Sequence, residues 1–173
     1  FGGTGRLGAY QSIGFGQTSD AVYLPGFLTG GATGDIKLTE AWGVRGAFNH
    51  NWDPFWSTSL WGSYAGVRYN GDAFDILSAK GQFCASFNFG KTRSADYSCN
   101  PDFNIAQVGM VTRWTPVKNL TFSGEVGAFF LDQKFTGAVG PGGAAVAAPK
   151  PVAVYEFKDQ STVYLNVRVQ RNF

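Results

Sequence analysis

The sequence predicts an all-β protein, a transmembrane antiparallel meander β-barrel. Three observations predict it: the composition, a repeated period-two alternation and the order of the connections. Of the 173 residues, 15% are charged and 16% are aromatic, and 24 are glycine. Glycine costs about 1 kcal/mol at a helical site, which disfavours a helical bundle, and disordered chains lack aromatic residues. The composition therefore favours a sheet that exposes aromatic side chains to something other than water.

Segments of about ten residues alternate between apolar and polar side chains, as the strands of a membrane barrel do. The clearest is TVYLNVRVQRNF at 162–173, where the valines and the leucine share one face and most polar side chains share the other. The segment at 56–69 is ambiguous, because Trp61 and Val67 fall on the same face as three serines. Six strands are predicted in all, at residues 7–17, 40–50, 56–69, 104–114, 119–132 and 162–173.

The connections between these strands alternate strictly between short and long. Short links fall at 50–55 and 115–119, and long links fall at 18–38, 70–103 and 136–160. An outer-membrane barrel has this pattern, with periplasmic turns at one end and extracellular loops at the other. We therefore expect one β-barrel domain over 1–173, with extracellular loops at 70–102 and 136–160, the second rich in Gly, Ala and Pro.

Aromatic residues gather at the strand ends, as they do where a barrel meets the two interfaces of a membrane. They are Trp42, Trp52, Phe55, Trp56, Tyr69, Phe103, Trp114, Phe130 and Phe173. A soluble β-sandwich would account for the strands, but it gives no reason for these positions or for the unequal connections.

The alternation also predicts which side chains face water inside the barrel. An arginine or lysine on the lipid face costs about 2–4 kcal/mol at the bilayer midplane. The mid-strand residues Arg45 and Arg168 should therefore point inward, although lumen charges can also be merely paired and solvated. The predicted pore-lining residues are Arg45, Gln107, Arg113, Glu125, Tyr164, Asn166 and Arg168.

The sequence predicts no catalytic residue, no metal site and no cofactor. The single histidine, His50, sits beside a predicted turn, and no familiar nucleophile or metal motif is present. Cys84 and Cys99 are 15 residues apart without a neighbouring histidine or second cysteine pair, which disfavours zinc. A disulfide is favoured over a pair of reduced thiols, because the segment between them is polar. A net charge of +2 without a basic cluster argues against nucleic acid as a partner.

No run of about 20 apolar residues predicts a transmembrane helix, since the nearest candidate, 137–154, is broken by prolines and a lysine. The chain opens with FGGTGRLG, which has no recognisable signal peptide. We therefore expect a chain that has been trimmed or that is part of a longer one.

Several blocks of the sequence resemble the porins of alphaproteobacteria such as the rhizobial and Brucella groups. They are SDAVYLPG at 19–26, AWGVRGAFNHNWDPFWSTSLWGSYAGVRYN at 41–70, CNPDFNIAQVGMVTRWTPVKNLTFSGEV at 99–126 and the terminal VRVQRNF. The resemblance implies a sixteen-stranded, water-filled, trimeric channel for passive diffusion of small hydrophilic solutes and ions. It also implies an outer membrane with its lipid bilayer and lipopolysaccharide as surroundings, and assembly machinery that reads the last strand and Phe173.

Six strands are fewer than the eight with which outer-membrane barrels begin, so the sequence looks like the last six strands of a longer porin. An alternative adds a hairpin from 74–78 and 82–89. It would give a small closed eight-stranded barrel that acts as an anchor, adhesin or assembly partner without an open pore. A strand count or a single-channel conductance separates the two.

Overall fold

The computed structural model describes residues 21–26, 34–140 and 153–173. Its main feature is one antiparallel six-stranded sheet in the order β1-β2-β3-β5-β6-β9, which confirms the predicted all-β class. A second, three-stranded sheet has the order β4-β7-β8. The main strands are β1 (Ala21–Leu24), β2 (Asp35–Asn51), β3 (Trp56–Tyr69), β5 (Phe103–Val117), β6 (Leu120–Gln133) and β9 (Gln160–Arg171). The other elements are α3 (Ala79–Asn88), β4 (Thr92–Arg93), β7 (Ala138–Gly140) and β8 (Tyr155–Glu156).

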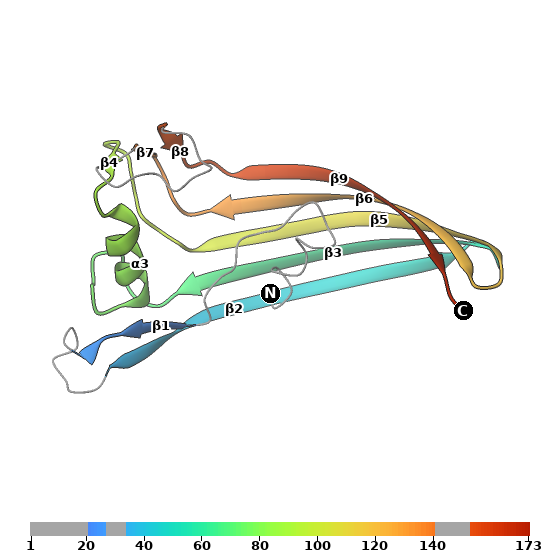
Figure 1. Ribbon diagram of the computed structural model, residues 1–173, viewed down its shortest axis with the longest axis horizontal. Helices are drawn as coiled ribbons and strands as arrows, with labels where there is room; N and C mark the ends of the chain where they lie inside the picture. The colour runs from blue at the N-terminus through green and yellow to red at the C-terminus, as the bar shows by residue number, and fades with distance from the viewer. Residues whose placement is uncertain (1–20, 27–33, 141–152) are drawn as a thin grey trace.

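The five long strands lie side by side in a single curved layer (Figure 1). Their spatial order is their chain order, so the sheet is a meander, and within the described residues β1 and β9 form its two edges. The helix and the small sheet lie at one end of the layer, and the two tight turns lie at the other (Figure 1). This arrangement separates long connections from short ones, as the sequence predicts.

The predicted strands at 40–50, 56–69, 104–114, 119–132 and 162–173 correspond to β2, β3, β5, β6 and β9, and most are longer than expected or shifted by one or two residues. The strand β2 has 17 residues because its first part pairs with the short β1, which lies inside the predicted link 18–38. The predicted strand at 7–17 lies outside the described residues.

The alternative hairpin at 74–78 and 82–89 is wrong, because Ala79–Asn88 is the helix α3. The Ser78 hydroxyl caps this helix by accepting a hydrogen bond of 3.0 Å from the Gly81 amide. A Cβ at Gly81 would lie 2.0 Å from the Asp75 carbonyl oxygen, so the first turn needs a glycine there. The described residues therefore supply no extra pair of strands for a small closed barrel.

A side-chain cap shapes one of the two short turns and a left-handed residue shapes the other. In the first, one carboxylate oxygen of Asp53 accepts the amides of Phe55 and Trp56 at 2.7 and 2.8 Å. In the second, Asn119 has a φ of 68°, a conformation that asparagine tolerates better than most residues. Both turns join adjacent strands directly, so the register of β2 with β3 and of β5 with β6 follows from them.

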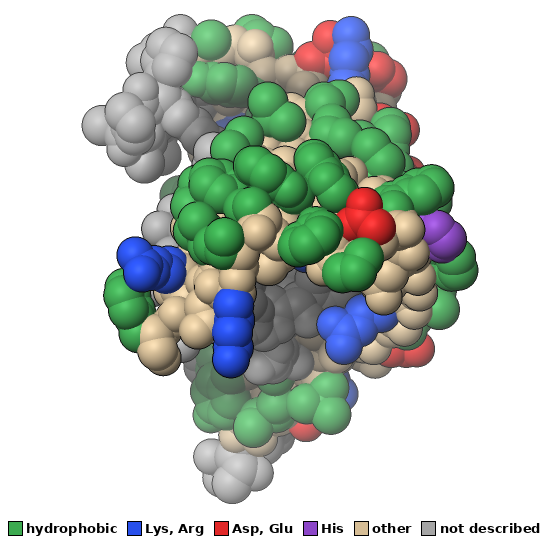
Figure 2. Space-filling model, turned by 90° about the vertical axis from the view of Figure 1, so that its right-hand side faces the viewer, with side chains coloured by type: hydrophobic (Ala, Val, Ile, Leu, Met, Phe, Trp, Pro, Cys, Tyr) green, Lys and Arg blue, Asp and Glu red, His purple; other side chains and the backbone are tan. Residues whose placement is uncertain are grey.

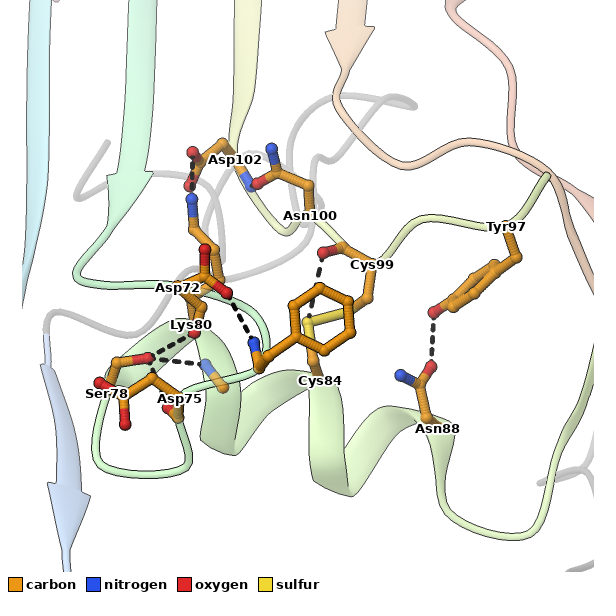
Figure 3. The surroundings of a disulfide bond; sticks show 12 residues. Asp72, Asp75, Ser78, Lys80, Cys84, Asn88, Tyr97, Cys99, Asn100 and Asp102 are labelled. Atoms are coloured by element: carbon orange, nitrogen blue, oxygen red, sulfur yellow. Dashed lines mark hydrogen bonds and ion pairs between the residues drawn. A yellow bond between two sulfur atoms is a disulfide. The ribbon is translucent and has the colours of Figure 1, made fainter.

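The helix α3 is tied to the loop end of the sheet at two points (Figure 3). The Lys80 Nζ lies 2.7 Å from an Asp102 carboxylate oxygen, and both side chains are largely buried. The other Asp102 oxygen accepts the Tyr69 amide at 2.9 Å, which joins this ion pair to the end of β3. Further along the helix, a disulfide links Cys84 to Cys99. The connection 70–102 is therefore a built structure and not an open loop.

The disulfide gives a direct prediction about the unfolded chain. We expect no free thiol in the unfolded, unreduced protein, and two after reduction, as counted by maleimide labelling and intact mass. Cross-linking residues 15 apart stabilises a fold by about 3 kcal/mol through loss of chain entropy in the unfolded state. The paired Cys84→Ser and Cys99→Ser substitution should therefore make the helix-bearing connection more sensitive to protease, with the sheet retained. Two reactive thiols before reduction would contradict the bond.

Candidate functional site

The register of the sheet places all seven predicted pore-lining residues on one face. Cross-strand partners share a face, as do residues two apart on one strand. In one row Arg45 pairs with Ser63 and Ser63 with Gln107. Nearer the short turns, Val111 pairs with Glu125 and Glu125 with Asn166, and in the next row Arg113 pairs with Ser123 and Ser123 with Arg168. Tyr164 pairs with Gly127, between the first two of these rows.

This polar face is the concave one. A hollow of about 580 Å³ is lined by side chains from β2, β3, β5, β6 and β9 together, which a flat or convex face would not allow. Its lining includes Ser59, Arg113, Glu125, Asn166 and Arg168. Figure 2 views the molecule from its short-turn end, and blue Lys and Arg side chains lie beside the hollow while hydrophobic side chains cover the arch above it.

The opposite, convex face is apolar and open. Its middle row consists of Phe48, Leu60, Met110, Val126 and Leu165, which are direct register partners in turn. On β9 the exposed fractions are 73% for Val163, 75% for Leu165 and 73% for Val167. A continuous apolar surface of this extent needs a covering other than water.

Aromatic side chains border this apolar face at both ends. Near the short turns, Trp56 stacks on Trp114 with ring centroids 5.7 Å apart, and Phe122 follows at 5.5 Å. Near the loop end, Trp42 and Tyr64 lie 5.5 Å apart. Trp56 and Tyr64 are eight residues apart on one strand. They are thus separated by about 27 Å along the strand, or about 20 Å along the normal of a barrel with tilted strands. That separation is close to the apolar band of about 25 Å in membrane barrels.

Beyond the loop-end aromatic row the convex face becomes polar. The Arg68 guanidinium donates to the Asn104 side chain at 2.6 Å, and the Asn104 amide nitrogen donates to Asp132 at 2.8 Å. Lys134 in turn lies 2.7 Å from Asp132. Charged residues on the convex face of the long strands therefore lie toward its ends, and the rows between the aromatic borders carry none.

On the concave face the arginines are not neutralised by the single glutamate. Arg113 donates to the Ser59 hydroxyl at 2.7 Å, and Glu125 accepts from the Tyr164 hydroxyl at 2.9 Å. Within the part of the chain that the structure describes, none of Arg45, Arg113 and Arg168 forms an ion pair. The rows from Arg45 to the short turns carry three arginines and one glutamate on this face, so this wall is electropositive.

The position of Trp61 follows from a feature that alternation alone does not reveal. Trp61 lies on the concave face with the serines, where its ring covers Gly109 on β5. In the same row Tyr164 covers Gly127 on β6. Each ring occupies the space that a side chain on the glycine would need. Paired glycines opposite aromatic residues are thus the signal that would have shown that Trp61 belongs with the serines on the polar face of the strand at 56–69.

The contact between Tyr164 and Gly127 predicts different effects of alanine substitution at two glycines of β6. A Cβ at Gly127 would meet the Tyr164 ring at 2.7 Å, whereas a Cβ at Gly124, on the convex face, would meet nothing within 4 Å. We expect Gly127→Ala to displace the ring from Glu125 and to lower the free energy of unfolding by about 1–3 kcal/mol. Gly124→Ala should be neutral or slightly stabilising. Urea unfolding in lipid vesicles measures both, and equal effects would contradict the contact.

Side chains outside the concave face that could carry chemistry make packing or hydrogen-bond contacts instead. The His50 ring packs edge-on against Trp52 at 4.4 Å beside the first short turn. Among the described residues there is no group of three or more potential metal ligands. None of the described helices is long and apolar enough to cross a membrane. In the connection near α3, partial burial raises the pKa of the Tyr97 hydroxyl, which donates to the Asn88 side chain.

A family model described as a porin subfamily matches residues 8–166, which is most of the chain. The chain belongs to the porin family. A porin works through the lining of a pore and not through catalysis, and the family places it in the outer membrane. The two faces of this porin's sheet agree with that setting, since one is polar and hollowed and the other is apolar between aromatic rows. We found no significant match among curated proteins or among solved structures.

Proposed function

We propose that the concave face lines a water-filled pore through which small hydrophilic solutes and ions diffuse passively across the outer membrane. The observation that carries the proposal is the register, which gathers Arg45, Gln107, Arg113, Glu125, Tyr164, Asn166 and Arg168 on the hollow side. Charged side chains at mid-strand depth would cost several kcal/mol in lipid, and in an aqueous lumen they remain hydrated. Such a wall sets selectivity through its charge and width.

The proposal requires more strands than this sheet contains. Six strands are too few to close a membrane barrel, and an open edge in lipid would leave backbone groups without partners. We therefore propose that β1 and β9 border further strands of a wider, sixteen-stranded barrel of the alphaproteobacterial type. A barrel of this size encloses an aqueous channel, whereas side chains fill an eight-stranded one.

The proposed setting gives each end of the sheet a side of the membrane. The short turns at residues 51–56 and 117–120 face the periplasm, and the connections 70–102 and 136–160 face the outside. The convex face contacts the lipid bilayer, lipopolysaccharide at the outer rim and neighbouring copies in a homotrimer. The assembly machinery reads the last strand with its terminal Phe173, whose side chain is fully exposed.

Conductance of the full chain in a planar lipid bilayer tests the function. We expect stepwise, long-lived openings whose conductance rises with the salt concentration of the bath. Passage of small sugars into proteoliposomes, measured by swelling, should fall with solute size. A protein that inserts with heat-modifiable mobility but opens no channel would refute the pore and would favour a closed barrel.

A further inference from the structure

The hollow at the short-turn end of the concave face brings charged and aromatic side chains together. Two arginines, a glutamate and a tryptophan line it together: Arg113, Arg168, Glu125 and Trp61. Its volume of about 580 Å³ is in the range of small-molecule sites. It lies at the same height as the Trp56–Trp114 aromatic row, toward the short turns, and the helix α3 and the small sheet lie at the opposite end of the layer (Figure 1).

The arginines are placed to hold one anionic group between them. Both Arg113 and Arg168 are register partners of Ser123, so their Cα atoms are two strand spacings apart, about 10 Å. The small serine leaves the space between the two stems open. One N–H group of Arg113 donates to the Ser59 hydroxyl, and the Arg168 guanidinium makes no hydrogen bond within the described residues. A guanidinium binds carboxylate and phosphate oxygens through paired hydrogen bonds.

The acidic group of the hollow does not cancel this charge. Glu125 is the single carboxylate that lines it, and it accepts from Tyr164 without forming an ion pair with either arginine. The described lining therefore carries one net positive charge. An anion that enters exchanges hydration for two guanidinium groups in a partly enclosed space, where electrostatic attraction is stronger than in open water.

A flat aromatic surface adjoins the arginines. Ser59, which holds Arg113, is two residues from Trp61 on the same face of β3. The atoms Cε2, Cζ2 and Cη2 of Trp61 lie beside Gly109, where no side chain competes for the space, and the same Trp61 side chain lines the hollow. A planar ring of a solute can stack on such a surface.

We propose that this hollow is a binding subsite for small organic anions that carry a flat ring. The carboxylate or phosphate lies between Arg113 and Arg168, and the ring stacks on Trp61. This inference rests on the proposed pore function and adds to it a class of solute that is held longer than others. Aliphatic anions lack the ring contact and neutral sugars lack both contacts, so both pass the same wall more quickly.

Single-channel current noise of the full chain in planar bilayers tests the subsite. Benzoate should give a longer residence time than acetate, which lacks the ring, and than benzyl alcohol, which lacks the charge. Phenyl phosphate beside benzoate decides whether either oxyanion is accepted. Arg168→Gln should shorten the benzoate residence about tenfold, the change expected when a charged hydrogen bond is lost. Trp61→Leu should shorten it about fivefold.

Two further variants separate binding from misfolding. Glu125→Gln keeps an oxygen for Tyr164 but removes the negative charge, so it should lengthen the benzoate residence. Arg171→Gln removes the same charge as Arg168→Gln from the opposite face of β9 and should leave the residence time unchanged. If no channel opens, this inference fails together with the proposed function. If channels conduct normally but benzoate, acetate and benzyl alcohol have equal residence times, the subsite alone is refuted.

Discussion

Replacing Arg45 and Arg168 by glutamate should shift the ion preference of the channel strongly toward cations. Each substitution changes the wall charge by two units, and the described rows carry three arginines against one glutamate. The double variant therefore turns an electropositive wall into an electronegative one. The measurement is the reversal potential in a potassium chloride gradient. The shift should shrink as salt rises, because the Debye length falls from about 10 Å at 0.1 M to about 3 Å at 1 M.

Assembly should remain intact in these variants, since neither Arg45 nor Arg168 forms an ion pair within the described residues. Arg171→Glu, on the convex face of the same strand as Arg168, provides the matched control and should leave selectivity unchanged in the channels that insert. Loss of insertion in the Arg45 or Arg168 variants, with unchanged selectivity in the surviving channels, would assign these arginines to a structural role.

A positive charge in the middle of the convex face should block insertion. Leu165 lies in the row with Phe48, Leu60, Met110 and Val126, midway between the two aromatic borders, and its side chain is 75% exposed. Leu165→Arg should cost about 2–4 kcal/mol at this depth. The expected result is a large fall in the fraction of protein that folds into lipid vesicles, measured by heat-modifiable mobility.

Asn166→Arg supplies the control for this substitution, because Asn166 follows Leu165 on β9 and points to the concave face. It introduces the same side chain one residue away and should fold as well as the native chain. Equal loss of folding in both variants would mean that the two faces do not differ in their surroundings.

The register of the long strands was largely predictable from the sequence. In β9 the alternation is nearly complete, and a slip of one residue would exchange every valine for a polar neighbour. Only one register therefore keeps the valines on the apolar face. The same alternation places Arg45 and Arg168 on the hollow face. Strand ends were less predictable, because pairing beyond the apolar band, as between β1 and the first part of β2, does not depend on an alternating pattern.

The helix α3 and the site of Trp61 were not predictable in the same way. The segment at 74–89 has short apolar runs that suit a strand or a helix, and its conformation depends on the Ser78 cap and on the Lys80–Asp102 ion pair with the sheet. Trp61 on the polar face contradicts simple alternation, and it is explained by Gly109 on the neighbouring strand, a contact between residues 48 apart in the chain.

Water accessibility along β9, measured by single-cysteine scanning in lipid bilayers, tests the central claim most directly. The native cysteines are joined in a disulfide and will not react. With a membrane-impermeant maleimide, cysteines at positions 164, 166 and 168 should be labelled and should reduce conductance. Cysteines at positions 163, 165 and 167 should stay unlabelled. Labelling of the second set, or uniform labelling of both sets, would contradict a sheet with one face in lipid and the other in a water-filled pore.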